Sequence, residues 1–577
     1  MTQRKDQTTI VDTSDGRNVQ LSGACSKWLS KIVVLVLIGT IGIAVVGIEN
    51  SWTNLSATYD EPYHIASGME WLHNGPNTNR LENPPLASVV VALGPYFRGL
   101  RSPSLWSLYV EGNTILYSDG SYSSNLASAR CSNLIFFALA CIAIFQWARG
   151  WFNRTAAIWA VILFLNLPPI LGHAGLATLD MACTATVAIA LYAFIRCIEN
   201  PSWQRLVLLG MALAFAFLCK FSSLPFLALG FLGAFVYFAA VTRDAVPSFA
   251  RWRLWILRAL IVSAVAFVLF WGGGYRFSCQ PIKDHSIAHP SIDRVFAKKP
   301  VLRNLAYKTI EIPVPLGQFA RQMYELQNHN ATGHDSYLLG KYRRTGWWYF
   351  FLVVVAVKTP IGFLILAGCG IVAILREGLR SCVWQRHLTV IFPGAITLVC
   401  LSSKIDLGVR HILPIYPFLA VIGGYAISEF FDVARRKSLT LAIVPLVLLA
   451  WVMTDSWVVR PDYIAYFNQF AGPHPENILA ESDLDWGQDL YRLSHRLKEL
   501  RVDHVSISYF GSAPLEKAGL PPYSLLSAEA PTTHGYAAIS VRYLTLEYAK
   551  NGSYAWLRNR TPLEIIGKTI YLYNLGE

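Results

Sequence analysis

Charged side chains are scarce in this sequence of 577 residues: they make up 15% of it, against 54% for hydrophobic residues. A soluble protein of this composition would struggle to cover its surface with polar groups. Apolar runs of about 20 residues recur along the chain, and each is long enough to cross the hydrocarbon core of a bilayer. We therefore expect a polytopic membrane protein, in which the net charge of +13 is no sign of a nucleic-acid partner.

Three further features are lacking: a disulfide framework, a signal-peptide cleavage pattern and internal repeats. The ten cysteines lie mostly inside apolar runs, where they act as small hydrophobic residues, and only Cys279 lies in a long outer loop. About thirty polar residues precede the first apolar run, Ile32 to Ile48, and no small-x-small pattern follows it before Glu49. We interpret this run as a retained helix.

The apolar runs predict eleven membrane-spanning helices. Every second connection is rich in arginine, for example at Arg149 and Arg154 or at Arg435 and Arg436. The positive-inside rule places these connections and the N-terminus in the cytoplasm, so the C-terminus lies outside. The expected spans are 32–48, 126–148, 155–172, 176–195, 206–219, 223–241, 254–272, 347–375, 388–402, 411–429 and 439–456.

This topology predicts an all-α polytopic membrane protein with a small extracytoplasmic α/β domain at its C-terminus. Residues 1–31 form a cytoplasmic tail, and residues 32–456 form the transmembrane domain. Two large loops of that domain, 49–125 and 273–346, lie outside, and the first contains apolar residues at helical spacing from Pro85 to Leu100, as in an interfacial helix. After Trp457 the composition changes to polar helical turns and short strand-like runs, which predicts an outer domain over 457–577.

Acidic residues gather where the chain leaves the first span. The sequence reads Tyr59-Asp60-Glu61-Pro62-Tyr63-His64 and, further on, Leu81-Glu82-Asn83-Pro84-Pro85-Leu86. A solvated loop is the ordinary interpretation of one acid in such a place. A pair of carboxylates among aromatic residues at a membrane exit favours a functional site.

Ionisable residues also stand at the outer ends of later spans. Asp180 opens the fourth span and Lys220 closes the fifth, while Arg410-His411 precedes the tenth. Ionisable groups at membrane depth usually face a cavity or a partner, although Lys220 alone could be a snorkelling anchor and Arg410 a topological flank. Asp60, Glu61, Asp180, Lys220 and Arg410 would together form a polar cleft, in which the bases suit an anionic headgroup and a carboxylate suits the activation of a hydroxyl.

The loop 273–346 adds four histidines and a basic junction. The spacings of His285, His289, His329 and His334 match no zinc signature, so solvated histidines are the better interpretation for most of them. Arg344, just before Trp347-Trp348, belongs either to an interfacial belt or to a site for lipid phosphate.

Taken in order, these motifs resemble the membrane glycosyltransferases of the protein O-mannosyltransferase and aminoarabinose-transferase superfamily. The resemblance covers nearly the whole chain, and it rests on the order of the motifs more than on any one of them. The matching motifs, beyond the two acidic stretches, are Thr178-Leu179-Asp180, Phe217-Leu218-Cys219-Lys220, Trp347-Trp348-Tyr349, Lys358-Thr359-Pro360, Arg410-His411-Ile412-Leu413-Pro414, Tyr466-Phe467-Asn468 and Asp483-Leu484-Asp485-Trp486-Gly487-Gln488-Asp489.

The resemblance implies a C-type glycosyltransferase fold and a polyprenyl-monophosphate sugar donor. It implies that Asp60 is the catalytic carboxylate beside Glu61, that Asp180 is the second acid, and that Lys220 and Arg410 hold the phosphate. The basic junction before Trp347 adds Arg344 as a further candidate for the phosphate. Glu82 matches a carboxylate that ligates a divalent metal ion in aminoarabinose transferases. The residue after it is lysine there and Asn83 here, which alters a donor contact.

Two functions remain open from the sequence. One is the transfer of mannose or a similar sugar to a protein, glycan or lipid acceptor on the outer face, usually with inversion. The other is secondary transport that uses the same charges. Transporters usually place such charges near the bilayer midplane and contain repeats, which favours the enzyme. The bacterial character of the tail favours a bacterial inner membrane with a periplasmic site over the endoplasmic reticulum.

The alternating arginines predict the side of each loop. Reporter tags inserted at residue 150, 250, 380 or 436 are expected in the cytoplasm, and tags at 300 or 577 on the outer side. Protease protection and cysteine accessibility of the tagged protein measure this. A cytoplasmic tag at 577 would contradict the eleven-span topology, because one span would then be miscounted.

Overall fold

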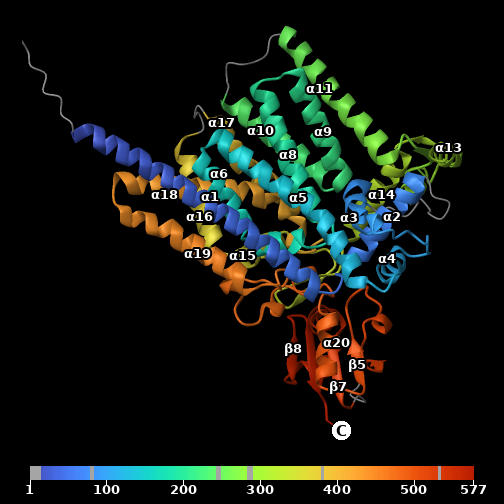
Figure 1. Cartoon of the computed structure of the whole chain (residues 1–577). Helices are drawn as coiled ribbons and strands as arrows, with labels where there is room; N and C mark the ends of the chain where they lie inside the picture. Colours follow the sequence, from blue (N-terminus) through green and yellow to red (C-terminus); the bar gives the residue numbers. More distant parts are fainter. Residues whose placement is uncertain are drawn as a thin grey trace, which may run out of the picture.

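The computed structural model describes residues 14–77, 83–241, 249–282, 290–378, 383–529 and 534–576. Long helices form the main body, and a small domain that contains the C-terminus projects from one end of it (Figure 1). The helices of the body at the predicted spans are α1 (Ser14–Asn54), α5 (Tyr122–Trp151), α6 (Arg154–Phe164), α7 (Pro168–Ala174), α8 (Asp180–Glu199), α9 (Trp203–Cys219), α10 (Ser223–Val241), α11 (Phe249–Leu269), α15 (Phe350–Lys358), α16 (Ile361–Arg376), α17 (Trp384–Leu401), α18 (Tyr416–Arg436) and α19 (Ile443–Val458).

Seven of the described helices are long and apolar enough to cross a membrane, or nine spans are present if each of two bent pairs counts as one. The pairs are α6 with α7, bent by 69°, and α15 with α16, bent by 114°. Both bends lie where a proline, Pro168 or Pro360, removes a backbone N–H and keeps the preceding residue out of the helical conformation. Eleven spans were predicted: of the other two, α9 has only 17 residues and α17 is not among the seven.

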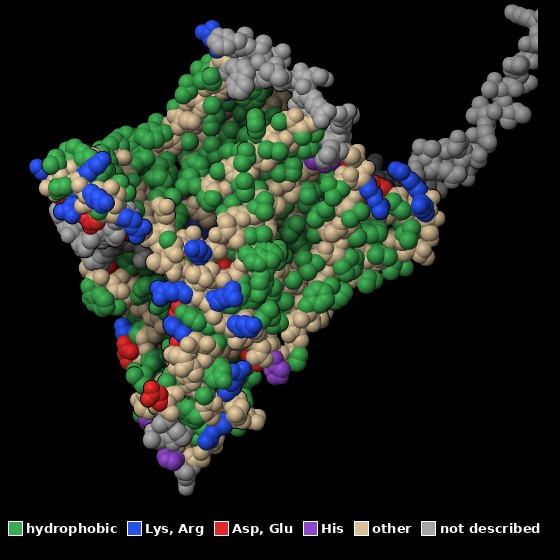
Figure 2. Space-filling view, turned by 180° about the vertical axis from the view of Figure 1, so that it is seen from behind, with side chains coloured by type: hydrophobic (Ala, Val, Ile, Leu, Met, Phe, Trp, Pro, Cys, Tyr) green, Lys and Arg blue, Asp and Glu red, His purple; other side chains and the backbone are tan. Residues whose placement is uncertain are grey.

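The surface of the helical body is largely hydrophobic. Figure 2 shows hydrophobic side chains over the helices, and basic side chains where the body meets the tail domain. Large apolar residues on the outside include Leu35 of α1, Phe235 of α10 and Leu260 of α11, which are 67%, 66% and 61% exposed. Such a surface is stable in a bilayer and not in water. The chain is an integral membrane protein.

The first large loop forms three helices, α2 (Glu61–Asn74), α3 (Pro85–Phe97) and α4 (Leu108–Tyr117). The helix expected at 85–100 is therefore present. Two glycines let these helices approach closely: a Cβ added to Gly68 of α2 would lie 2.0 Å from the carbonyl oxygen of Ser88, and one added to Gly112 of α4 would lie 1.9 Å from that of Pro62. The contact at Pro62 fixes the start of α2, directly after Asp60.

The second large loop is less regular. Its described residues contain α12 (Pro290–Val295), α13 (Pro300–Ile310), α14 (Gly317–Thr332) and the strand pairs β1 (Cys279–Gln280) with β2 (Val314–Pro315) and β3 (Ser336–Leu338) with β4 (Lys341–Arg343).

The tail folds as the predicted α/β domain. Its five-stranded sheet has the order β6-β5-β7-β9-β8, with β5 parallel to both neighbours and β9 antiparallel to both of its own. Helix α20 covers one face through Leu490, Leu493 and Leu497, which are fully buried with Val505 and Leu572 of the sheet. The elements are α20 (Leu490–Glu499), β5 (Val505–Ser508), β6 (Tyr523–Leu525), β7 (Tyr536–Ser540), α21 (Tyr548–Asn551), α22 (Ala555–Arg558), β8 (Glu564–Ile566) and β9 (Ile570–Asn574).

The close approach at Gly112 gives a test of this packing. Gly112→Ala places a methyl group against a backbone oxygen that cannot swing away, so we expect a loss of roughly 1–3 kcal/mol in unfolding free energy. Gly150→Ala is the matched control, because a Cβ at Gly150 meets no atom within 4 Å. Thermal unfolding of both detergent-purified variants measures the difference. Equal melting temperatures would show that α2 and α4 do not pack as described.

Candidate functional site

A buried ion pair fixes the turn that begins α2. The Glu61 and Arg130 side chains are 0% exposed and lie 2.8 Å apart. Glu61 also accepts hydrogen bonds from the backbone N–H groups of Thr58 and Ala177, at 2.8 and 2.9 Å. Burial opposes ionisation of Glu61, but the charge and hydrogen bonds of Arg130 outweigh it and lower the pKa of the carboxyl. The pair thereby joins the start of α2 and helix α5 to the loop before α8.

Two further ion pairs lie beside this junction, and they contain four of the predicted residues. Arg410 donates from Nη1 to Oδ2 of Asp60 at 2.6 Å, and Lys220 donates from Nζ to Oδ1 of Asp180 at 2.6 Å. The side chains of Asp60, Lys220 and Arg410 are 22%, 16% and 13% exposed, and that of Asp180 is 3% exposed. We call these four residues the charged cluster.

Helix ends bring the charged cluster together. Asp60 precedes α2, Asp180 is the first residue of α8, Lys220 directly follows α9, and Arg410 lies shortly before α18. Backbone N–H groups that lack partners at the start of α8 add a favourable field for the carboxylate of Asp180. The charges therefore lie at one end of the helical body and not in the middle of its spans.

Two buried histidines complete the surroundings of the charged cluster. His173 of α7 places Nδ1 3.7 Å from Oδ2 of Asp180. His64 of α2 is 7% exposed, and its Nδ1 has no hydrogen-bond partner in the part of the chain that the structure describes. Burial lowers the pKa of His64 to about 4; the positive charges of Arg410 and Lys220 act in the same direction and the acids oppose them. His64 is therefore neutral near pH 7, and it interacts electrostatically with all four residues of the charged cluster.

Comparison with known proteins identifies the fold. Residues 122–271 match the family model described as dolichyl-phosphate-mannose-protein mannosyltransferase. The oligosaccharyltransferase AglB of Archaeoglobus fulgidus in the apo form has a TM-score of 0.51 and 13% identity over 92% of this chain and 72% of its own. The protein has the C-type glycosyltransferase fold. The superfamily expected from the sequence motifs is thereby confirmed.

Two other solved structures to which this chain is similar contain a lipid phosphate. AglB in complex with an inhibitory peptide and a dolichol-phosphate has a TM-score of 0.50 at 13% identity, over 92% of this chain and 72% of its own. ArnT from Cupriavidus metallidurans bound to undecaprenyl phosphate has a TM-score of 0.46 at 14% identity, over 93% of this chain and 97% of its own. No curated protein matches the sequence.

The other predicted site residues are not members of the charged cluster or lie outside the described residues. Arg344 is exposed after β4, and it forms no ion pair within the described residues. His334, one of the four histidines of the loop 273–346, lies near Glu481, and its Nε2 is 3.5 Å from Oε1 of that residue. Glu82, His285 and His289 are outside the described residues. Among the described residues, no group of three His, Cys, Asp or Glu side chains is placed to hold a metal ion. The metal site predicted at Glu82 remains a prediction.

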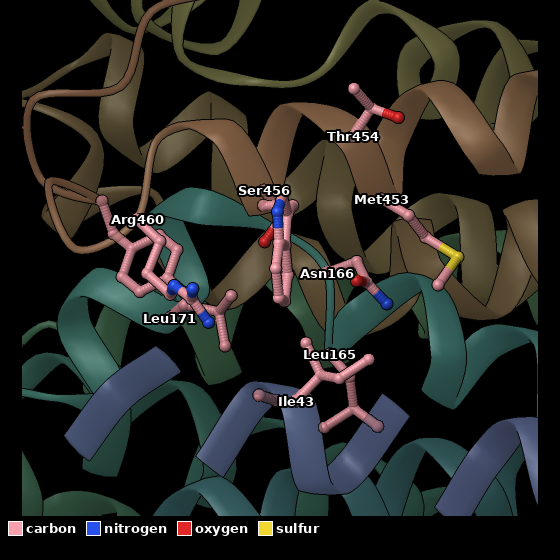
Figure 3. A pocket seen from close by; sticks show the side chains of 11 residues that line it. Ile43, Leu165, Asn166, Leu171, Met453, Thr454, Ser456 and Arg460 are labelled. Atoms are coloured by element: carbon pink, nitrogen blue, oxygen red, sulfur yellow. The ribbon is translucent and has the colours of Figure 1, made fainter. Parts of the chain in front are cut away.

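A separate groove of about 260 Å³ lies between α1, α7 and α19 (Figure 3). Apolar side chains of α1, α7 and α19 line it, among them Ile43, Leu171 and Met453, with Asn166 between them and Arg460 at one end. It contains neither a carboxylate nor a member of the charged cluster. None of the site residues predicted from the sequence lines this groove.

The residues predicted from the sequence did not include Arg130 or His173. Arg130 is the fifth residue of a predicted span, and His173 directly follows another. Both are ionisable groups at membrane depth, and such groups suggest a function or a buried partner. That signal was available for both residues. Their partners, Glu61 and Asp180, are 69 and 7 residues away in the chain and could not be read from spacing.

Loss of Arg130 tests the buried pair. Arg130→Met leaves the charge of Glu61 buried without a cation, which typically costs ~3–5 kcal/mol of stability. The double variant Glu61→Gln, Arg130→Met removes that charge and is expected to recover much of the loss. Thermal unfolding of the single and double variants measures both. A double variant no more stable than Arg130→Met would mean that the pair is not the source of the cost.

Proposed function

We propose that this protein moves a sugar from a polyprenyl-monophosphate donor to an acceptor at the outer face of the membrane. The observation that carries the proposal is the charged cluster: a carboxylate and an arginine in contact, beside a second acid and base, at one end of the membrane helices. A base for the acceptor and cations for the leaving phosphate are the two requirements of the reaction. A transport site would more often lie near the midplane.

The donor phosphate is assigned to Lys220 and Arg410, with Arg344 as a further contact on the loop after β4. Arginine and lysine are common binders of phosphate, and charge-assisted hydrogen bonds to phosphate are short and strong. The family model for residues 122–271 is named for dolichyl-phosphate-mannose, and one AglB structure contains dolichol-phosphate. Both support a lipid monophosphate here, with mannose or a similar hexose or pentose as the sugar.

Asp60 is assigned as the general base. Its Oδ2 is occupied by Arg410, while Oδ1 accepts no hydrogen bond within the described residues, and the side chain is partly exposed. Oδ1 takes the proton of the acceptor hydroxyl as the acceptor oxygen forms a bond to the anomeric carbon. The bond from that carbon to the phosphate oxygen breaks on the opposite side, and the polyprenyl phosphate leaves with the electron pair, so the anomeric centre inverts.

Glu61 and Asp180 support this step without touching the reacting atoms. Glu61 is saturated with hydrogen bonds, so its role is to hold Asp60 at the start of α2. Asp180 orients Lys220 through their 2.6 Å contact. The acceptor is a protein, glycan or lipid, and the compartment is the periplasmic side of a bacterial inner membrane.

Asp60→Asn tests the base. It keeps the size of the side chain and removes the charge, so turnover with a polyprenyl-phosphate sugar and membrane-extracted acceptor should fall by roughly 10²–10⁴-fold. Glu49→Gln, an exposed carboxylate near the outer end of α1, is the matched control and should keep parental turnover. Mass spectrometry of the product measures transfer.

Three outcomes would overturn the assignment. A parent protein that transfers no sugar excludes the proposed reaction. Near-parental turnover in Asp60→Asn with an inactive Asp180→Asn places the base on α8. Normal turnover per folded molecule, with a lowered melting temperature, makes Asp60 a structural residue.

A further inference from the structure

The segment from Asp483 to Asp489 belongs to the tail, yet it reaches the charged cluster. Trp486 at its centre is 2% exposed. The guanidinium carbon of Arg410 lies 4.6 Å from the centre of the Trp486 ring, and the ring of His173 lies 6.0 Å from it in an edge-to-face arrangement. A residue of the extracytoplasmic domain is therefore in contact with two side chains of the site.

The segment accepts hydrogen bonds from backbone N–H groups beside both members of the Asp60–Arg410 pair. The N–H of Tyr59, next to Asp60, donates to the carbonyl of Trp486 at 2.8 Å. The N–H of Val409, next to Arg410, donates to Oδ1 of Asp483 at 2.9 Å. The position of Trp486 is thus tied to the neighbours of both members of the Asp60–Arg410 pair.

The same segment is attached to the tail domain through buried carboxylates. Asp485 is 0% exposed and accepts from the N–H of Arg542 after β7 at 3.3 Å. Asp489 is 1% exposed and accepts from the hydroxyl of Thr569 before β9 at 2.9 Å. Burial raises the pKa of Asp485 to about 7 and that of Asp489 to about 6, because removal from water disfavours the charged carboxylate. The segment is a rigid link between sheet and site.

The contacts of Arg410 leave one edge of its guanidinium for a ligand. Nε donates to the carbonyl of Leu407 at 3.3 Å and Nη1 donates to Asp60 at 2.6 Å. Within the described residues, no hydrogen bond to a protein group uses Nη2. With one face on the indole ring and two edges held, the guanidinium plane has a fixed orientation, and the Nη2 edge is the one that remains to meet an oxyanion.

We propose that Trp486 is a positioning residue for the donor phosphate and acts through Arg410. The indole face attracts the guanidinium in a partly desolvated site and fixes its plane, so that the same arginine holds Asp60 with one edge and the lipid phosphate with the other. This inference rests on the proposed function. It assigns to the tail domain a part in binding the donor.

The test compares Trp486→Leu and Trp486→Phe with the parent. The leucine variant loses the aromatic face, so the donor KM and the dissociation constant for undecaprenyl phosphate should rise on the order of tenfold, with the acceptor KM unchanged. The phenylalanine variant keeps a face and should recover most of the binding. Trp457→Leu is the matched control, because Arg460 lies 4.1 Å from that ring, away from the charged cluster.

A double-variant cycle separates positioning from stability. If Trp486 acts through Arg410, then Trp486→Leu should weaken lipid-phosphate binding in the parent but change little in an Arg410→Ala background. Equal losses in both backgrounds, or a lower melting temperature with unchanged binding, overturn the inference. If the leucine variant does not fold, the cycle with Trp486→Met, which also lacks an aromatic face, decides by the same criterion.

The two proposals fail separately. A parent that binds undecaprenyl phosphate but transfers no sugar contradicts the proposed function, while the cycle still tests Trp486 by binding. A parent that transfers sugar, with no coupling between Trp486 and Arg410, contradicts only the inference.

Discussion

The buried pair of Glu61 and Arg130 is the constraint on which the site depends. Neither charge reaches solvent, so each is tolerable only because the other and a set of backbone groups compensate it. Those backbone groups belong to the turn before α2, which contains Asp60, and to the loop before α8, which leads directly to Asp180. An ion pair of this kind contributes little net stability compared with apolar packing, but it allows one arrangement of three chain segments and penalises the others.

The tail domain closes the same end of the bundle. In Figure 1 its sheet hangs below the helical body, and the attachment runs through Asp483 to Asp489, which contacts the turn at Tyr59 and the loop at Val409. Lys358, 1% exposed, donates to the carbonyls of Ile464 and Asp483 at 2.6 Å each, which joins the broken pair α15–α16 to this link. Buried polar contacts of this density do not suit a freely moving appendage.

Sequence patterns predicted the helices well because apolar length is a local property. Helices occupy all eleven predicted positions, but proline breaks two of them, and α9 and α17 do not meet the length or hydropathy of a span. Asp60, Asp180, Lys220 and Arg410 were identified from their places at helix ends. Their pairing, Asp60 with Arg410 across 350 residues, depends on the packing of the bundle, which no local pattern encodes. The pairing of Arg130 with Glu61 could not be predicted for the same reason.

In the proposed reaction, Arg410 contacts both the donor phosphate and Asp60, the acid assigned to the acceptor. Without a donor, the two acids and two bases of the charged cluster compensate one another, as groups at membrane depth must. An arriving phosphate competes with Asp60 for the positive charge of Arg410. In the proposed reaction the leaving phosphate therefore lies beside the acid that is assigned to the acceptor, because both contact the same arginine.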